Sequence, residues 1–118
     1  MMKFNRHELE NKYALVIGLL SSLEEEVVSE EEYLATKDSD INTDEGFNLY
    51  FNTIIKPWVM ARDKNKREKL VRLLDDLLTN DSLLISDVFD NKFLICNISD
   101  NDIFLKRLKK KLTVSGLM

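Results

Sequence analysis

The chain has 118 residues, the length of one domain, and a net charge of −4 from 17 Lys and Arg against 21 Asp and Glu. This acidity argues against a dedicated nucleic-acid-binding domain, and the 44% apolar content argues against a disordered chain. A single cysteine excludes an intramolecular disulfide, and a single histidine excludes a site with two histidine ligands. Three glycines and one proline favour helices over a turn-rich β fold.

The most apolar segment near the N-terminus, residues 13–20, follows Glu8, Glu10 and Lys12. It is too short to span a membrane, which takes about 20 apolar residues. It also lacks the small-residue cleavage site of a secretory signal. The free thiol of Cys96 suits a reducing compartment. We therefore expect a cytoplasmic protein without a membrane association.

Two helices are predicted in the first third of the chain. The first spans residues 6–28, where apolar residues at helical spacing form one wide face. This face comprises Leu9, Tyr13, Val16, Ile17, Leu19, Leu20, Leu23 and Val27. A short second helix runs from Ser29 to Leu34, because Ser29 and Glu32 have the spacing of a capping box. We expect Tyr33 and Leu34 to face inward, and residues 36–42 to form a polar loop.

The third helix is predicted to begin after Thr43, an N-cap residue that is followed by acidic side chains. Pro57 interrupts its apolar stripe, so we expect a kink or a restart near Lys56. The stripe consists of Phe47, Tyr50, Phe51, Ile54 and Trp58. A polar connection follows over residues 62–66.

Residues 67–79 have the clearest helical pattern of the sequence, and Asn80 is a suitable C-terminal cap. The apolar arc of this helix is Leu70, Val71, Leu73, Leu74, Leu77 and Leu78. The following segment, Ser82 to Ile98, fits either a β-hairpin that turns at residues 90–91 or two short helices. Its apolar run has no period, and the turn lacks the glycine that a tight hairpin favours.

The last helix is predicted to begin after Ser99 as its N-cap, with acidic residues in the first turn and basic residues in the last. Its apolar stripe is Phe104, Leu105, Leu108 and Leu112. Residues 113–118 are expected to fray. Taken together, these patterns predict a mainly α single domain over residues 1–118 with about five helices. A small β-hairpin near residues 84–98 is an open alternative that would make the fold α+β.

No motif for catalysis or for a cofactor emerges. The loop that begins at Asp38 has oxygen ligands at alternate positions, but the sixth and twelfth positions are Thr43 and Leu49. An EF-hand needs Gly and Glu there, so no metal site is predicted. His7 has no nucleophile with a recognisable motif, and Cys96 in its apolar run is interpreted as a core residue. We predict a protein that is not an enzyme and that needs no cofactor or metal.

The acidic side chains are concentrated in the first half, where residues 1–60 hold twelve acidic and five basic residues. Like charges packed together cost stability unless they are solvated or neutralised by a partner. A solvated face is one interpretation. The other is a docking surface for a basic protein, with charge guiding encounter and aromatic side chains as anchors. The predicted partner-binding residues are Glu24, Glu25, Glu26, Glu30, Glu31, Glu32, Tyr33, Asp38, Asp40, Asp44 and Glu45.

The last helix carries a second cluster of charge, namely Lys106, Arg107, Lys109, Lys110 and Lys111. These cations suit contacts with phosphates, to which Arg62, Lys64, Lys66, Arg67 and Lys69 can add if they lie nearby. They also suit the C-terminal end of a helix, and they can pair with the acidic half of the chain. A nucleic-acid-binding regulator is therefore the alternative function, and a helical adaptor or oligomerisation module is a third.

A small, acidic, helical single domain with no catalytic motif and an acidic stretch from Glu24 to Glu45 resembles the bacterial toxin-immunity proteins of colicin and contact-dependent inhibition systems. The resemblance lies in length, acidity and helix content, so it assigns a role to no individual residue. It implies a tight complex with a cognate toxin, often a nuclease, whose basic active site the immunity protein masks.

Overall fold

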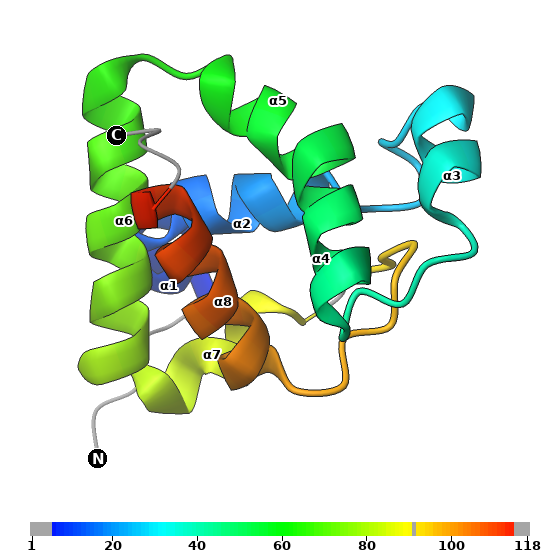
Figure 1. The fold of residues 1–118 in the computed structure, drawn as a ribbon. Helices are drawn as coiled ribbons and strands as arrows, with labels where there is room; N and C mark the ends of the chain where they lie inside the picture. The colour runs from blue at the N-terminus through cyan, green and yellow to red at the C-terminus, as the bar shows by residue number, and fades with distance from the viewer. Residues whose placement is uncertain (1–5, 91, 115–118) are drawn as a thin grey trace.

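The computed structural model describes residues 6–90 and 92–114 and is mainly α, as the sequence predicts. Its α-helices are α1 (Arg6–Lys12), α2 (Ala14–Ser21), α3 (Glu30–Thr36), α4 (Asp44–Tyr50), α5 (Lys56–Met60), α6 (Lys64–Thr79), α7 (Ile85–Val88) and α8 (Asn101–Val114). A π-helical turn, η1 (Phe51–Ile55), joins α4 to α5, and a 3-10 turn, η2 (Ser82–Leu84), precedes α7. Helix α6 lies at one end of the molecule and α3 at the other (Figure 1).

The core is built where α6 packs against α2 and α8. The predicted apolar arc of α6 is largely correct, since Leu70, Leu73, Leu74 and Leu77 are buried. All four residues of the predicted α8 stripe are buried as well. Aromatic rings join α4 to α8: Phe47 and Phe104 meet edge to face, with ring centroids 5.9 Å apart. This packing fixes the relative positions of α4, α6 and α8.

The first predicted helix is broken in two and ends earlier than expected. The break falls at Tyr13, whose backbone (φ −105°, ψ 25°) is not helical and whose buried hydroxyl donates a hydrogen bond to the Asp81 carboxylate. After α2 ends, the chain turns toward the extended segment near residue 94. There Glu25 N donates to Phe93 O at 2.8 Å, and Ile95 N donates to Leu23 O at 2.9 Å. These bonds draw the backbone out of the helix.

The capping box at the start of α3 is confirmed, with Glu32 N donating to Ser29 Oγ at 3.1 Å and Ser29 N donating to the Glu32 carboxylate at 2.9 Å. The expected inward orientation of Tyr33 and Leu34 is wrong, because these side chains are 44% and 54% exposed. Helix α3 has only two turns, and its buried residue is Thr36, which had been assigned to the loop.

The predicted Thr43 cap of α4 is confirmed, since Gly46 N donates to Thr43 Oγ1 at 3.0 Å. The irregularity expected near Lys56 is also present. Pro57 has no N–H for the preceding turn, and the helix widens into η1 directly before α5 begins. Helix α6 begins at Lys64, within the predicted polar connection, because Asp63 caps it by accepting from Lys66 N at 2.9 Å.

The β-hairpin alternative is not formed in the described part of the chain. Residues 82–88 are helical, and Leu94 makes an isolated antiparallel bridge with Glu24 rather than with residues 84–88. Residue 91, at the predicted turn, lies outside the described residues. Phe93 O and Ile95 N thus bond to the turn that follows α2 rather than to a local partner strand.

The predicted N-cap of the last helix is wrong by one residue. Helix α8 begins at Asn101, and Asp100 accepts from Ile103 N at 3.1 Å in the manner of an N-cap. Ser99 instead donates its N–H and its hydroxyl to Asn42 Oδ1, at 3.0 and 3.1 Å. The helix continues through Thr113 and Val114, and the rest of the expected frayed tail lies outside the described residues.

Candidate functional site

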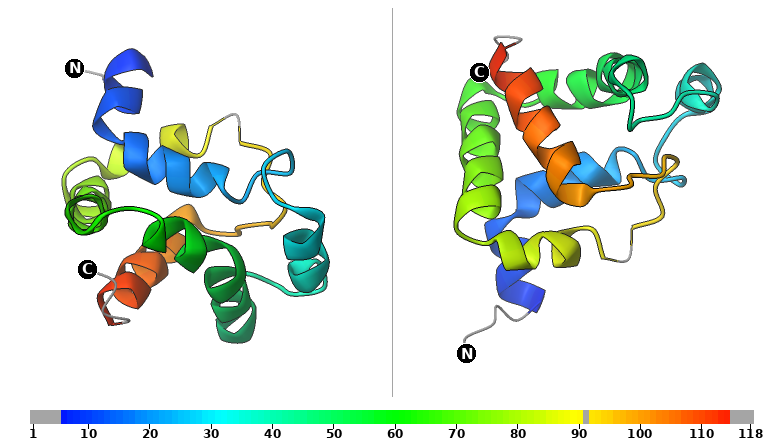
Figure 2. Two further views of the ribbon diagram at one scale, coloured as in Figure 1. Left: turned by 90° about the horizontal axis from the view of Figure 1, so that it is seen from above. Right: turned by 60° about the horizontal axis from the view of Figure 1, so that its bottom comes forward.

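Four glutamates gather at the end of the molecule formed by α3 and the turn before it. Glu25 and Glu26 lie in the turn, Glu30 and Glu31 lie in the first turn of α3, and all four are exposed. None of them lies within 4.0 Å of a basic side chain in residues 6–90 and 92–114. Both views in Figure 2 show α3 at the end of the molecule that is remote from α6.

Exposed apolar side chains accompany these glutamates. Val27 is 58% exposed and Phe93 is 76% exposed, and Phe93 lies beside Glu25 through the backbone hydrogen bond between them. Leu34 follows Glu30 and Glu31 by four and three residues, so the three side chains share one face of α3. We call the set Glu25, Glu26, Val27, Glu30, Glu31, Leu34 and Phe93 the acidic end. Its apolar members were missed as surface residues because helical spacing assigned Val27 and Leu34 to the core.

Four of the other predicted acidic residues, Asp40 among them, are engaged within the chain. Glu24 is half-buried and lies 4.0 Å from Lys92, and Glu32 belongs to the capping box. Asp44 lies 3.4 Å from Arg107 of α8, away from the acidic end. Asp38 and Glu45 are exposed. Tyr33 is exposed.

Asp40 belongs to a hydrogen-bond network centred on Asn42. Asp40 Oδ1 accepts both the backbone N–H and the side-chain amide of Asn42, each at 2.9 Å. The same amide donates to Asn97 O at 2.7 Å, and Arg107 donates to Asn42 O at 3.2 Å. Together with the two bonds from Ser99, these contacts engage Asp40 Oδ1 and Asn42 Oδ1, two of the oxygens of the candidate cation loop. No group of three or more potential metal ligands comes together among the described residues.

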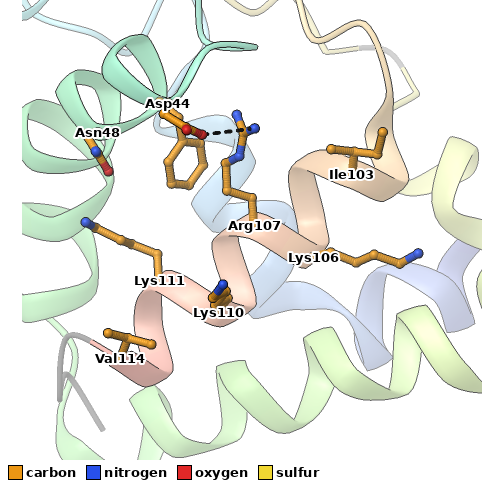
Figure 3. Close-up of a pocket in the computed structure, with 9 residues that line it drawn as sticks. Asp44, Asn48, Ile103, Lys106, Arg107, Lys110, Lys111 and Val114 are labelled. Atoms are coloured by element: carbon orange, nitrogen blue, oxygen red, sulfur yellow. Dashed lines mark ion pairs between the residues drawn. The ribbon is translucent and has the colours of Figure 1, made fainter.

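A groove of about 540 Å³ lies between α4 and α8, and we call it the basic groove. It is lined by Asp44, Phe47, Asn48, Ile103, Lys106, Arg107, Lys110, Lys111 and Val114. Figure 3 shows Arg107 paired with Asp44 and Lys111 extending toward α4, while Lys106 points away from α4. Arg107 also lies over the Phe47 ring, 5.5 Å from its centroid. Ile103 and Val114 are the first and last residues of α8 that line the groove, and both are more than half exposed.

The basic residues at and just before the start of α6 do not join this groove into one phosphate-binding surface. Arg62 lies over the Trp58 ring at 4.1 Å, and Arg67 donates to Arg62 O at 2.9 Å. Lys69 does line a cavity with Lys109. However, Asp75 and Asp76 line that cavity too, and Lys109 pairs with Asp75 at 2.5 Å. These carboxylates weaken the case for a continuous nucleic-acid interface.

The remaining side chains that can ionise or act as nucleophiles have contacts that fit structural roles. Burial raises the pKa of the Cys96 thiol to about 12, which keeps it protonated and unreactive at neutral pH. Burial and the bond to Asp81 raise the pKa of Tyr13. Burial opposes ionisation of Asp81, but its bonds with Lys12 and Tyr13 outweigh this and lower its pKa. His7 is exposed, with its ring nitrogen Nε2 3.3 Å from the Asn11 amide.

No family model, curated protein or solved structure matches the chain. The described helices are also all too short or too polar to cross a membrane. The function is therefore inferred from the acidic end and the basic groove themselves.

Proposed function

We propose that this chain is a non-enzymatic binding protein whose acidic end docks a basic protein partner. The observation that carries this proposal is the exposure of Val27, Leu34 and Phe93 among four glutamates. Apolar anchors surrounded by charge have the composition of a specific interface, in which buried apolar groups hold the partner and charges guide it. A merely solvated face has no need of three exposed apolar side chains.

The two kinds of residue have separate effects on binding. Uncompensated carboxylates attract a basic protein over about 8–10 Å at physiological ionic strength and can raise its association rate 10- to 1,000-fold at low salt. Apolar contacts at Leu34 and Phe93 lower the dissociation rate, because water is excluded only once the complex has formed. Association is therefore expected to depend strongly on salt, and dissociation much less.

The partner that we propose is a toxin domain, and most specifically a toxin nuclease. A nuclease holds phosphates with basic side chains, and an acidic surface with apolar anchors can cover such a site. The class resemblance to toxin-immunity proteins supports this choice, as does the net charge of −4.

The test compares tagged protein with two charge-reversal variants during capture from the native host. Glu30→Lys with Glu31→Lys changes the acidic end, and Asp87→Lys with Asp90→Lys makes the same change in net charge on exposed residues at α7. Glu32 is left intact because it caps α3. We expect a stoichiometric basic protein with wild type and with the α7 variant, and its loss with the α3 variant.

The captured protein, identified by mass spectrometry, is then expressed alone and together with this chain. Growth arrest that co-expression relieves is the result expected for a toxin and its immunity protein. Equal capture by both charge-reversal variants would remove the acidic end from the interface. If the captured partner is not toxic, the proposed docking surface stands and the immunity role is rejected.

A further inference from the structure

The basic groove is not used by the proposed function, and part of its charge is uncompensated. Among the described residues, Lys106 and Lys110 have no carboxylate within 4.0 Å, whereas Arg107 and Lys109 have Asp44 and Asp75. Lys106 and Lys110 are exposed and four residues apart on α8. Two like charges at this spacing repel each other, so an acidic occupant is favourable here.

The apolar residues of the groove indicate a protein occupant. Ile103, Lys106, Lys110 and Val114 follow one another at steps of three, four and four residues and form one stripe along α8. Nucleic-acid phosphates make no use of the exposed apolar side chains of Ile103 and Val114. An acidic helix with an apolar side chain can pair with the cations and cover one apolar end of the stripe.

The chain itself carries such a helix. On α3, Glu30 and Glu31 lie one turn from Leu34, so that two carboxylates and one apolar side chain share a face. The stripe on α8 presents two ammonium groups, each one turn from an apolar side chain. Seven residues of α3 span about 10 Å, and the stripe from Ile103 to Val114 spans about 16 Å, so α3 is short enough to lie along the stripe.

We propose that the basic groove binds the acidic end of a second copy of this chain. The contact is between molecules, since within one molecule α3 packs on α4 and η1 while α8 packs on α6 and α7. The two surfaces differ, so the association is head to tail and can continue from copy to copy. It also covers the surface assigned above to the basic partner, and the second copy and that partner therefore compete.

This inference shares the acidic end with the proposed function but adds the groove, which allows the two to be tested separately. Sedimentation equilibrium at 50 mM and 500 mM salt compares wild type with three variants. Two variants are those described above at α3 and α7, and the third is Lys106→Glu with Lys110→Glu. Neither of these lysines makes a side-chain bond within the described chain, so circular dichroism should match that of wild type.

Wild type and the α7 variant are expected to associate at 50 mM salt, with an affinity at least tenfold weaker at 500 mM. The α3 variant and the groove variant are each expected to be monomeric. An equimolar mixture of these two should associate again, because a basic α3 then meets an acidic groove and a native α3 meets a native groove. The groove variant should still capture the basic partner, whereas the α3 variant should not.

Three results would overturn the inference. The first is a wild-type monomer at all concentrations in low salt. The second is a mixture of the α3 and groove variants that stays monomeric, because recovery by exchanged charges is specific to this pairing. The third is a wild-type association that requires co-purified nucleic acid and disappears after nuclease treatment, which would assign the groove to phosphates. Partner capture that persists in the α3 variant, together with loss of its self-association, would count against the proposed function alone.

Discussion

Gly46 offers a sharp test of the structure, because its backbone approaches the preceding loop closely. A Cβ atom at this position would lie 1.7 Å from Asp40 O and 2.9 Å from Thr43 Oγ1. The obstacle at Asp40 is backbone and cannot rotate away. At Gly18, by contrast, a Cβ atom would lie 3.1 Å from the Trp58 ring, which is a partly buried side chain rather than backbone and needs to move only slightly. Gly18→Ala is therefore the matched control for Gly46→Ala.

The two substitutions differ in how the gain in helix propensity compares with the steric cost to stability. Alanine in a helix is favoured over glycine by about 1 kcal/mol at either site. At Gly46 the loop must move, which costs about 1–3 kcal/mol, and disturbance of the Thr43 cap costs about 1 kcal/mol more. The net expectation is a destabilisation of about 1–3 kcal/mol, or a melting temperature lower by roughly 5–15 °C. Gly18→Ala should stay within about 1 kcal/mol of wild type.

Urea unfolding followed by circular dichroism measures both differences under the same conditions. The reasoning would be refuted by a Gly46→Ala protein as stable as Gly18→Ala, since that outcome requires open space where the Asp40 carbonyl is placed. Crystallisation is not needed to decide the matter. The sign of the difference between the two variants is enough.

Three further results are expected. Ser29→Ala removes the capping box, so it should cost about 1 kcal/mol and speed amide exchange within α3; unchanged exchange there would contradict the assigned cap. Because folding lowers the pKa of Asp81, its carboxylate stabilises the folded state at pH values above the unfolded-state pKa. This stabilisation is lost as the pH falls. Asp81→Asn should therefore flatten the decline of the urea midpoint between about pH 5 and pH 2, and an unaltered slope would count against the lowered pKa. Cys96 should react with a thiol reagent at pH 8 about a thousand-fold more slowly than an ordinary cysteine, with a normal rate in urea; equal rates would mean an open thiol.

The helical spacing of apolar residues correctly predicted the helices whose apolar face packs against another long helix. Helices α6 and α8 pack against each other, and most apolar positions in their patterns are buried. Local chemistry was similarly informative where one side chain and one amide decide the outcome. The caps at Ser29 and Thr43 are examples.

The sequence pattern failed where a distant contact competes with local structure. Tyr13 fits the helical face, yet its hydroxyl bond to Asp81 accompanies a break in the helix. Val27 and Leu34 have core spacing, but the chain has already turned away from the core to reach Phe93. Because the same two residues belong to the acidic end, this failure also hid the apolar half of the candidate site. Its glutamates were visible from composition alone.

The hydrogen-bond network centred on Asn42 joins segments that are far apart in the sequence, and this affects how the chain folds. Asn42 and Ser99 are 57 positions apart, so their hydrogen bonds close a loop of about half the chain. Closing such a loop costs about 3–4 kcal/mol in chain entropy, which local helices do not repay. The bonds therefore form after α6 has brought α8 back toward α4, and this makes them a late event in folding. The loop that leaves α3 and the segment that enters α8 become ordered in the same step.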